Sequence, residues 1–193
     1  MLKLQPASLR FRQIEEKDHD LLVQWITGDT WPHHLFENPT EDDVRKWISK
    51  GKYDEPDYRA FFAFLADESQ SNAVVNTPVA YTRLEELTDL TPVFDLRIRS
   101  DFRGKGLGRA VLNWLTRYVF TQTDKLRFEG HTRADNIGMQ KVFRSCNWVQ
   151  EAYYRQAWPD KSGGTHDAVA FAILKSDWEN GTRTPIKWDP SNE

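Results

Sequence analysis

Between a strand-like run and the most regular amphipathic segment of this 193-residue chain lies the heptapeptide Arg103-Gly104-Lys105-Gly106-Leu107-Gly108-Arg109. After it, apolar residues recur at steps of three and four, which predicts a helix over residues 104–120. Glycines let a backbone turn tightly and approach a ligand closely, and the unpaired N–H groups of a first helical turn attract an anion. Residues 97–109 also hold five basic side chains against one acidic side chain. The segment therefore predicts a binding loop for a small ligand with several phosphates.

Three sequence patterns of phosphate-binding loops were compared with this segment, and one of them matches. A Walker A loop needs Ser or Thr after its Gly-Lys, but Gly106 follows Lys105 here. A dinucleotide-binding fingerprint needs glycine at the position of Arg109. The pattern Arg/Gln-x-x-Gly-x-Gly/Ala is met without gaps by Arg103, Gly106 and Gly108. A glycine-rich turn that only starts the helix is the alternative without a ligand.

On these residues the sequence resembles the GNAT superfamily of acyl-CoA N-acyltransferases, in which this motif holds the pyrophosphate of coenzyme A on backbone amides. Residues 136–148 are similar to the family's second signature, an Asn that opens a helix ending in Gly-Phe, although the ending here is Asn147-Trp148. Residues 167–178 resemble the RimJ/RimL-like branch of ribosomal-protein N-terminal acetyltransferases. Elements similar to the family cover about residues 9–178.

The resemblance implies that acetyl-CoA is the acyl-donor co-substrate. It also implies that the opening Asn136 contacts the pantetheine arm, for which simple N-capping of the helix is the alternative. A backbone N–H near Ile98 or Arg99 would polarise the thioester carbonyl. The residues expected to contact the cofactor are Ile98, Arg99, Arg103, Gly104, Lys105, Gly106, Leu107, Gly108, Arg109 and Asn136.

The expected fold class is α+β, close to α/β. Strands are predicted at residues 58–66, 78–85, 93–100, 125–132, 148–158 and 167–174, and helices after Asp18, after Thr40 with a capping box to Asp43, at 104–120 and at 136–146. One crossover helix joins strands 93–100 and 125–132, which predicts a parallel, right-handed connection. The resemblance implies a GNAT fold: a central mixed, mostly antiparallel sheet whose two parallel strands splay apart, with two helices on each side. We expect one domain over residues 1–180 and a polar tail over 181–193.

Both predicted parallel strands carry polar side chains on one face. Burying these side chains away from water costs free energy, so we expect this face to border a solvent-filled cleft. In the first strand Asp95, Arg97 and Arg99 alternate with apolar residues, and in the second Leu126, Phe128 and Gly130 are expected in the core. The remaining face of the second strand carries Arg127, Glu129 and His131. The family binds its substrate where these strands diverge.

Transfer of an acetyl group to an amine needs a base. We favour His131, because an imidazole has an ordinary pKa of about 6.5 and related N-terminal acetyltransferases carry a glutamate base five residues before the opening Asn. Glu129 orients the imidazole or is the base itself, and Asp95 is a third candidate; a structural role for His131 is the alternative. Many relatives have a tyrosine at the position of Phe143, and phenylalanine cannot donate a proton. The thiolate leaving group is therefore protonated by another hydroxyl, from Tyr153 or Tyr154, by a water, or by no specific acid.

The aromatic loop before Thr40 supplies the expected acceptor wall of Trp31, His33, His34 and Phe36, although Trp31 and Phe36 also suit a role in capping the core. His33 and His34 lack the accompanying ligand spacing of a zinc site, so no metal is expected. The implied function is an acetyl-CoA-dependent N-acetyltransferase in which a primary amine attacks directly in a ternary complex. The amine is a protein N-terminus or a small molecule such as an aminoglycoside or polyamine. A non-catalytic acyl-CoA-binding or sensor module, favoured by Phe143, and a pure interaction domain are the alternatives.

Composition limits the partners and the compartment. The longest apolar run has seven residues, 60–66, against about 20 for a membrane span, and no secretory leader is recognised. A single cysteine, Cys146, is typical of a reducing cytoplasm. The net charge of −3 disfavours nucleic acid as a partner. We expect a cytoplasmic monomer or homodimer.

Overall fold

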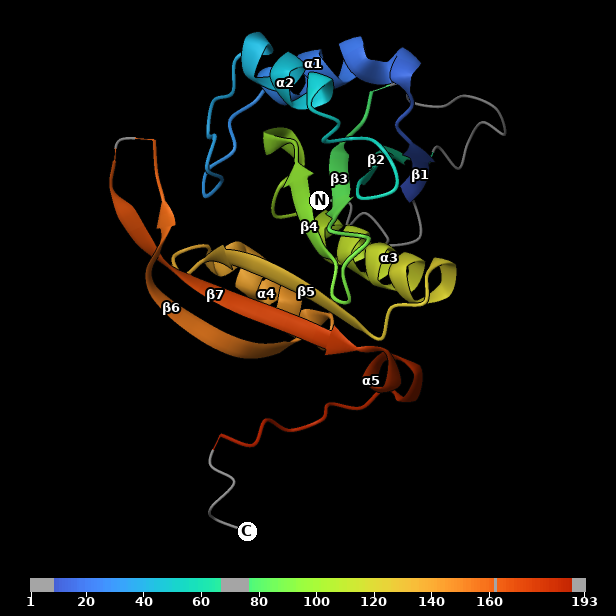
Figure 1. The fold of residues 1–193 in the computed structure, drawn as a ribbon, viewed down its shortest axis with the longest axis vertical. Coiled ribbons are helices and arrows are strands. Elements are labelled where there is room, and N and C mark those ends of the chain that lie inside the picture. Colours follow the sequence, from blue (N-terminus) through green and yellow to red (C-terminus); the bar gives the residue numbers. More distant parts are fainter. Residues whose placement is uncertain (1–8, 67–76, 162, 189–193) are drawn as a thin grey trace.

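The computed structural model describes residues 9–66, 77–161 and 163–188 (Figure 1). The strands are β1 (Leu9–Gln13), β2 (Arg59–Leu65), β3 (Ala80–Glu85), β4 (Val93–Ile98), β5 (Arg127–Arg133), β6 (Val149–Pro159) and β7 (Thr165–Leu174). The helices are α1 (His19–Thr27), α2 (Glu41–Ser49), α3 (Leu107–Gln122), α4 (Ile137–Ser145) and α5 (Lys175–Asn180). The predicted α+β class is confirmed. Within the described part of the chain, no helix is long and apolar enough to cross a membrane.

The strands form two antiparallel sheets, ordered β1-β2-β3-β4 and β5-β7-β6. The edge strands β4 and β5 meet at one end, where the Glu129 N–H donates to the Pro92 carbonyl at 3.1 Å. From there β4 rises toward α1 and α2 while β5 runs along β7 (Figure 1). The predicted mixed sheet is therefore divided into two antiparallel ladders along the line where its central strands diverge.

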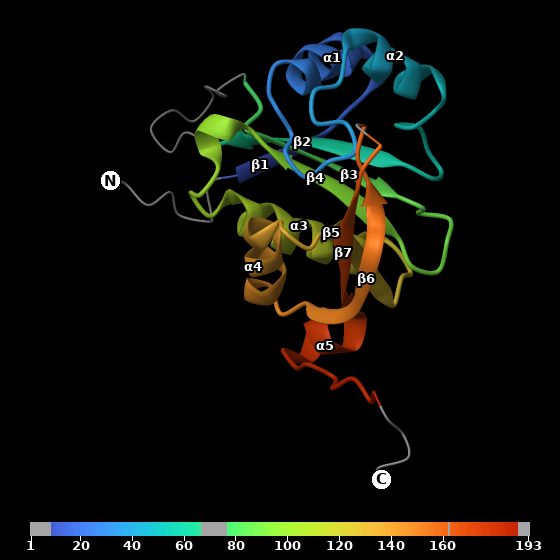
Figure 2. The same ribbon diagram turned by 90° about the vertical axis from the view of Figure 1, so that its left-hand side faces the viewer.

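Strand β2 separates two parts of the core, because successive side chains on a strand point to opposite faces. Phe62 packs in one cluster with α1 and α2, whereas Phe61 packs in another with α3. Helices α1 and α2 thus cover one face of the first sheet and α3 covers the other (Figure 2). Helix α4 lies against the second sheet, where the rings of Phe143 and Phe171 stack with centroids 4.6 Å apart.

Local signals predict some N-terminal details and miss others. The capping box at α2 is confirmed, since Thr40 Oγ1 accepts from Asp43 N–H at 3.2 Å and the Asp43 carboxylate accepts from Thr40 N–H at 3.0 Å. Helix α1 begins at His19 as expected, but Asp18 does not cap it with its side chain. That carboxylate instead accepts two hydrogen bonds from Arg12 of β1, at 2.6 and 2.9 Å.

Three further features differ from the prediction. Strand β1 and helix α5 are additional elements, both too short to give a periodic pattern. Leu126 is 71% exposed rather than buried, because β5 begins only at the next residue. In addition, the described part of the tail contacts α5, since Thr182 N–H donates to the Asp177 carbonyl at 3.0 Å and Thr184 N–H donates to the Asp177 carboxylate at 2.9 Å. Residues 1–8 of the expected domain and 189–193 of the expected tail lie outside the described residues.

An aromatic cluster fills the angle between the two sheets. Phe94 of β4 packs on Phe128 and on Trp148, with ring centroids 5.3 and 5.8 Å apart. Gly130 of β5 makes room for this cluster, since a Cβ at that position would lie 2.6 Å from Phe94 and 2.8 Å from Phe143. Real Cβ atoms do not approach so closely, so a side chain there forces the rings apart.

Gly130→Ala is expected to lower the free energy of unfolding by about 1–3 kcal/mol through overpacking. Urea denaturation followed by tryptophan fluorescence measures this change. The matched control is Gly138→Ala in α4, where a Cβ would make an ordinary 3.6 Å contact and alanine favours the helix. Equal stability of the two variants would contradict the role assigned to Gly130.

Candidate active site

Two adjoining cavities lie where β4 and β5 diverge. The first, of about 410 Å³, is bounded by the loop between α1 and α2, by β3 and β4, and by His131. The second, of about 680 Å³, runs along the N-terminal ends of α3 and α4. The residues that line both are His33, His34, Leu96, Arg97, Asn136 and Met139. A long molecule in the second cavity thus reaches the first at this shared wall.

The glycine loop shapes one end of the second cavity. Gly104 and Gly106 have φ angles of +73° and +83°, a left-handed conformation that favours glycine. A Cβ on either would contact nothing within 4 Å, so both face open space. Gly106 is the N-cap of α3 and no side chain caps this end, which leaves the first N–H groups of the helix available for an anion.

Gly108 has a different function in the same motif. A Cβ on it would lie 3.1 Å from Cγ2 of Val142, so its glycine allows α3 to approach α4 closely. Leu107 is 3% exposed and its side chain belongs to the core. Only the main chain of these two residues is therefore directed to a ligand.

The basic residues around the loop divide into two groups. Arg109 and Lys141 line the second cavity and are placed to attract phosphate. Lys141 was not predicted from the sequence, although it follows Asn136 by five residues in the second signature. Lys105 and Arg99 do not line either cavity; Lys105 lies over the Phe102 ring and Arg99 over the Trp25 ring.

Arg103 lines the second cavity, but its hydrogen bonds are made to the protein. Its Nε donates to the Ile98 carbonyl at 2.9 Å and its Nη2 donates to the Thr30 carbonyl at 2.5 Å. The guanidinium also lies 5.6 Å from the ring centroid of Trp31. Arg103 therefore joins the glycine loop to β4 and to the aromatic loop, and its direct contact with phosphate stays a prediction.

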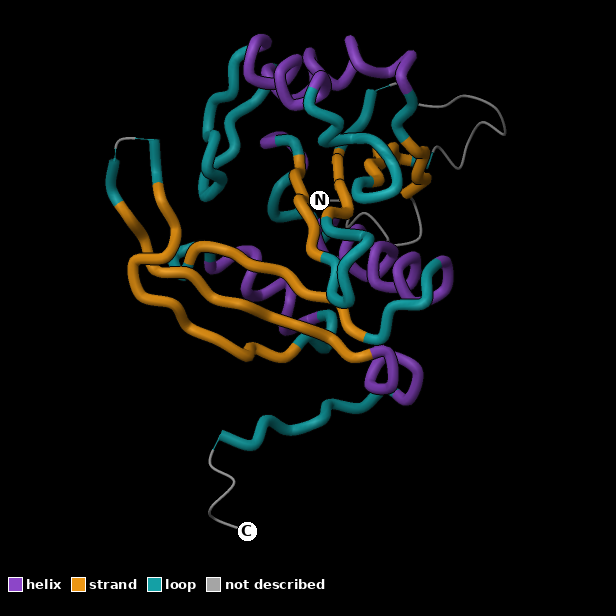
Figure 3. The backbone as a smooth tube through the Cα atoms, viewed as in Figure 1, coloured by secondary structure: helices purple, strands orange, loops and turns teal. Residues whose placement is uncertain are grey.

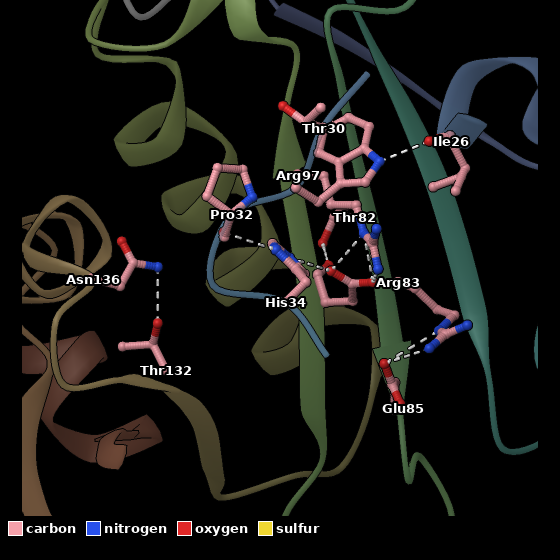
Figure 4. Close-up of polar contacts among 12 residues, drawn as sticks. Ile26, Thr30, Pro32, His34, Thr82, Arg83, Glu85, Arg97, Thr132 and Asn136 are labelled. Carbon is pink, nitrogen blue, oxygen red and sulfur yellow. Dashed lines mark hydrogen bonds and ion pairs between the residues drawn. The ribbon is translucent and has the colours of Figure 1, made fainter. Parts of the chain in front are cut away.

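Asn136 caps α4 and borders both cavities. Its Oδ1 accepts from Met139 N–H at 3.1 Å, and its Nδ2 donates to Thr132 Oγ1 at 2.9 Å (Figure 4). The capping alternative is confirmed. The predicted contact with a pantetheine arm is compatible with it, because one N–H of the amide lies outside these two bonds.

The edge of β4 distinguishes the two candidate carbonyl-polarising amides. Arg99 N–H donates to the Val79 carbonyl at 3.0 Å and is already paired. Successive N–H groups of a strand point to opposite sides, so the N–H of Ile98 points away from β3 and toward the gap. Ile98 lines the second cavity and Arg99 does not. Ile98 is therefore the better candidate.

His131 lines the first cavity, and a carboxylate fixes its orientation. Its Nε2 lies 2.5 Å from Oε1 of Glu129, which also pairs with Arg127. A carboxylate only accepts, so the hydrogen is assigned to Nε2 and Nδ1 is the basic nitrogen. Burial opposes ionisation of Glu129, but the hydrogen bonds from His131 and Arg127 outweigh it and lower its pKa. Glu129 does not line either cavity, which favours its predicted role in orienting the imidazole over a role as the base.

Asp95 also lines the first cavity, but it is held as a paired anion. Its carboxylate accepts from Arg97 Nε at 3.0 Å, and His34 Nε2 lies 3.2 Å away. Burial opposes its ionisation, yet the Arg97 charge and the His34 hydrogen bond keep the pKa of Asp95 well below its usual range. Such a carboxylate is a weak base, which argues against its predicted catalytic use.

The four residues expected to contact the acceptor do not all line the same cavity. His33 and His34 line both, Phe36 lines the first, and Trp31 lines the second. Trp31 is 1% exposed and its Nε1 donates to the Ile26 carbonyl at 2.7 Å, so its role in the core is confirmed (Figure 4). The loop that carries these residues descends from the helices toward the gap (Figure 3).

Several residues of the first cavity were not predicted from the sequence. They come from α2, β3, β6 and the loop after α2, and are Trp47, Lys52, Tyr53, Arg83, Glu85 and Trp158. Tyr153 and Tyr154 line neither cavity, and the Tyr153 hydroxyl donates to Asp167 at 2.5 Å. Phe143 is fully buried in the core. Among the described residues, no group of three or more His, Cys, Asp or Glu side chains is placed to hold a metal ion.

A cleft beside a glycine loop at a helix N-terminus is the arrangement expected from the resemblance to acyl-CoA N-acyltransferases. Residues 8–149 match the model of the Acetyltransferase (GNAT) domain, so the chain belongs to this family and is an acyltransferase enzyme. GNAT acetyltransferases use acetyl-CoA.

Individual relatives are more distant. The chain is 22% identical over 172 residues to the uncharacterized N-acetyltransferase YnaD of Bacillus subtilis (strain 168), covering 88% of this chain and 95% of that protein. The spermidine N-acetyltransferase of Vibrio cholerae in complex with CoA and spermine has a TM-score of 0.71 at 18% identity, covering 90% and 99% of the two chains. A chimera of Vibrio cholerae SpeG and hSSAT has a TM-score of 0.73 at 19% identity, with the same coverage. None of these names a ribosomal-protein acetyltransferase, so that finer assignment stays a prediction.

Asp95→Asn is expected to cost about 3–5 kcal/mol of the free energy of unfolding at pH 7, because it leaves Arg97 buried and unpaired. The pKa of Asp95 is lower in the folded state, so its stabilisation is complete above about pH 4 and is lost as pH falls further. The cost of the substitution should therefore be about 1 kcal/mol smaller at pH 3 than at pH 7. Urea unfolding at both pH values measures this, with the exposed Asp20→Asn as control; a cost independent of pH would contradict it.

Proposed function

We propose that this enzyme transfers the acetyl group of acetyl-CoA to a primary amine by direct attack in a ternary complex. The observation that carries the proposal is the meeting of the two cavities at His33, His34, Asn136 and Met139. A donor lying along α3 and an acceptor entering beside His131 would have their reacting atoms at this shared wall. Direct transfer needs such a meeting point, since each reactant must be positioned within contact distance of the other.

The second cavity fits the donor. Gly104 and Gly106 leave the space of their missing side chains open, and the uncapped N–H groups that start α3 face it. We assign the diphosphate to these amides, with Arg109 and Lys141 neutralising the remaining phosphate charge. Bound acetyl-CoA supplies a thioester carbonyl, and the Ile98 N–H is the donor that stabilises negative charge on its oxygen.

The first cavity receives the amine, and His131 takes its proton. The amine nitrogen forms a bond to the carbonyl carbon, and one N–H proton passes to Nδ1 of His131, directly or through a water. The C–S bond then breaks with its electron pair on sulfur, and the resulting thiolate is protonated from solvent. Glu129 holds the imidazole in the tautomer that leaves Nδ1 free. Phe143 has no proton to give, so no side-chain acid is assigned.

Gly106→Val is expected to abolish binding of acetyl-CoA, because the added side chain occupies the space of the diphosphate. Isothermal titration calorimetry with acetyl-CoA measures the loss. The matched control is Gly163→Val in the β6–β7 hairpin: its φ of +87° imposes the same backbone strain, and its Cβ also meets nothing within 4 Å. Unchanged affinity of the Gly106 variant would place the phosphates elsewhere and overturn the proposal.

His131→Gln should lower kcat/KM by about 10²–10⁴ and remove the fall of the rate at low pH that protonation of a base produces. Glu129→Gln should give a smaller loss that appears in kcat, since it disturbs only the orientation of the imidazole. Tyr154→Phe, next to His131 but outside both cavities, is the control and should be neutral. Release of free thiol from acetyl-CoA across pH 5–9 measures all three. A wild-type pH profile in His131→Gln would eliminate His131 as the base.

A further inference from the structure

The charged residues of the first cavity point to the kind of amine it accepts. Three permanent cations line it, Lys52, Arg83 and Arg97, against two carboxylates, Glu85 and Asp95. We infer, on the basis of the proposed function, that the acceptor is a monoamine that carries an anionic group on an apolar body, and that a polyamine is not the preferred acceptor. This acceptor differs from the spermidine and spermine that are named for the structural neighbour from Vibrio cholerae.

Neither carboxylate of the cavity is available for a second ammonium group. Glu85 accepts from Arg83 Nη2 at 2.7 Å and Nε at 3.2 Å (Figure 4). Asp95 lies 2.9 Å from Arg97 Nη2 and is also faced by His34. These ion pairs are largely buried, with side-chain exposures between 8% and 26%. Breaking a buried pair to bind a polycation leaves an arginine uncompensated, at a cost of several kcal/mol.

Carboxylates just outside the cavity also face cations. Asp135 lies 2.6 Å from Arg133 Nη2, and Glu37 lies 3.6 Å from Nη1 of the same arginine. At the tip of the β6–β7 hairpin, Lys161 lies 3.7 Å from Asp43 and 4.2 Å from the Phe36 ring centroid. Each of these carboxylates therefore already faces a cation, and none of them is left unpaired to attract a polyamine to the cavity.

The donors of the cavity, in contrast, exceed its acceptors. Lys52 Nζ donates to the Tyr58 hydroxyl at 2.6 Å, and this hydrogen bond raises the pKa of Lys52, so its ammonium stays charged. Arg97 Nη1 and Trp158 Nε1 are buried and have no hydrogen-bond partner among the described residues. Buried donors in native proteins are normally satisfied. An oxyanion on the acceptor is the chemistry that this donor-rich wall complements.

The other walls of the cavity are aromatic. They comprise Phe36, Trp47, Tyr53, Phe94 and Trp158, and Phe36 meets Trp47 edge to face with centroids 5.0 Å apart. Such walls favour an apolar or aromatic body over a hydrated chain. An amine with an apolar side chain and a carboxylate, of the amino-acid type, combines all three features.

The test compares matched acceptors with saturating acetyl-CoA and thiol release as the readout. The panel is L-phenylalanine and its amide, L-methionine and its amide, phenethylamine and spermidine. We expect kcat/KM at least tenfold higher for each acid than for its amide and for spermidine, although the amides have the more readily deprotonated amines. If an amide or spermidine is the equal or better acceptor, the inference is overturned while the transferase proposal stands. If no amine releases thiol above the rate of hydrolysis, the proposed function itself fails.

Two variants should change the acid-to-amide ratio in opposite directions. Lys52→Gln removes the surplus cation and should lower the ratio several-fold, whereas Glu85→Gln frees Arg83 and should raise it. The control is Lys50→Gln, an exposed lysine two residues from Lys52 that does not line the cavity. A ratio cancels any general loss of folded enzyme. Movement of both cavity variants in the same direction, or no movement in either, would contradict the electrostatic assignment.

Discussion

The angle between the two sheets depends on the contact of Phe94 with Gly130. At this point the edge strands β4 and β5 touch, and the rings of Phe128, Phe143 and Trp148 fill the space around them. A backbone hydrogen bond from the Glu129 N–H to the carbonyl of Pro92 joins β5 to the residue just before β4. Beyond it the aromatic cluster prevents continued pairing, so the polar atoms of both strand edges are left facing a gap. The two cavities occupy that gap.

The three histidines of the cleft share one arrangement. Each has a nitrogen within 3.3 Å of a carboxylate: His33 of Asp135, His34 of Asp95, and His131 of Glu129. The partners differ in what else holds them, since Asp95 is buried against Arg97 while Glu129 is shared with Arg127. Of the three, His131 is the one that lies on a strand, β5, whereas His33 and His34 lie on the loop between α1 and α2. A histidine paired with a carboxylate is therefore a structural contact at His34 and a candidate catalytic base at His131.

The features predicted from the sequence are those that depend on neighbouring residues. The Thr40 capping box and the helix opened by Asn136 are encoded within a few residues, and both were found where expected. The helix after the glycine loop was also predicted, but it begins at Leu107 rather than at Gly104. Asp95 shows the limit of this reasoning, because alternation placed it on a polar face but did not reveal the arginine and histidine that neutralise it. The first cavity is lined by α2, α4, β3, β4, β5, β6 and three loops. No local sequence pattern therefore predicts that Arg83 or Trp158 lines it.

Arg103 has a consequence that extends beyond its place in the motif. By donating to the carbonyls of Ile98 and Thr30, it joins the glycine loop to the end of β4 and to the aromatic loop that begins at Trp31. Because one guanidinium makes both hydrogen bonds, the glycine loop cannot move relative to the aromatic loop without breaking one of them. The arginine that opens the glycine motif therefore connects a wall of the second cavity to the loop whose His33 and His34 line both cavities.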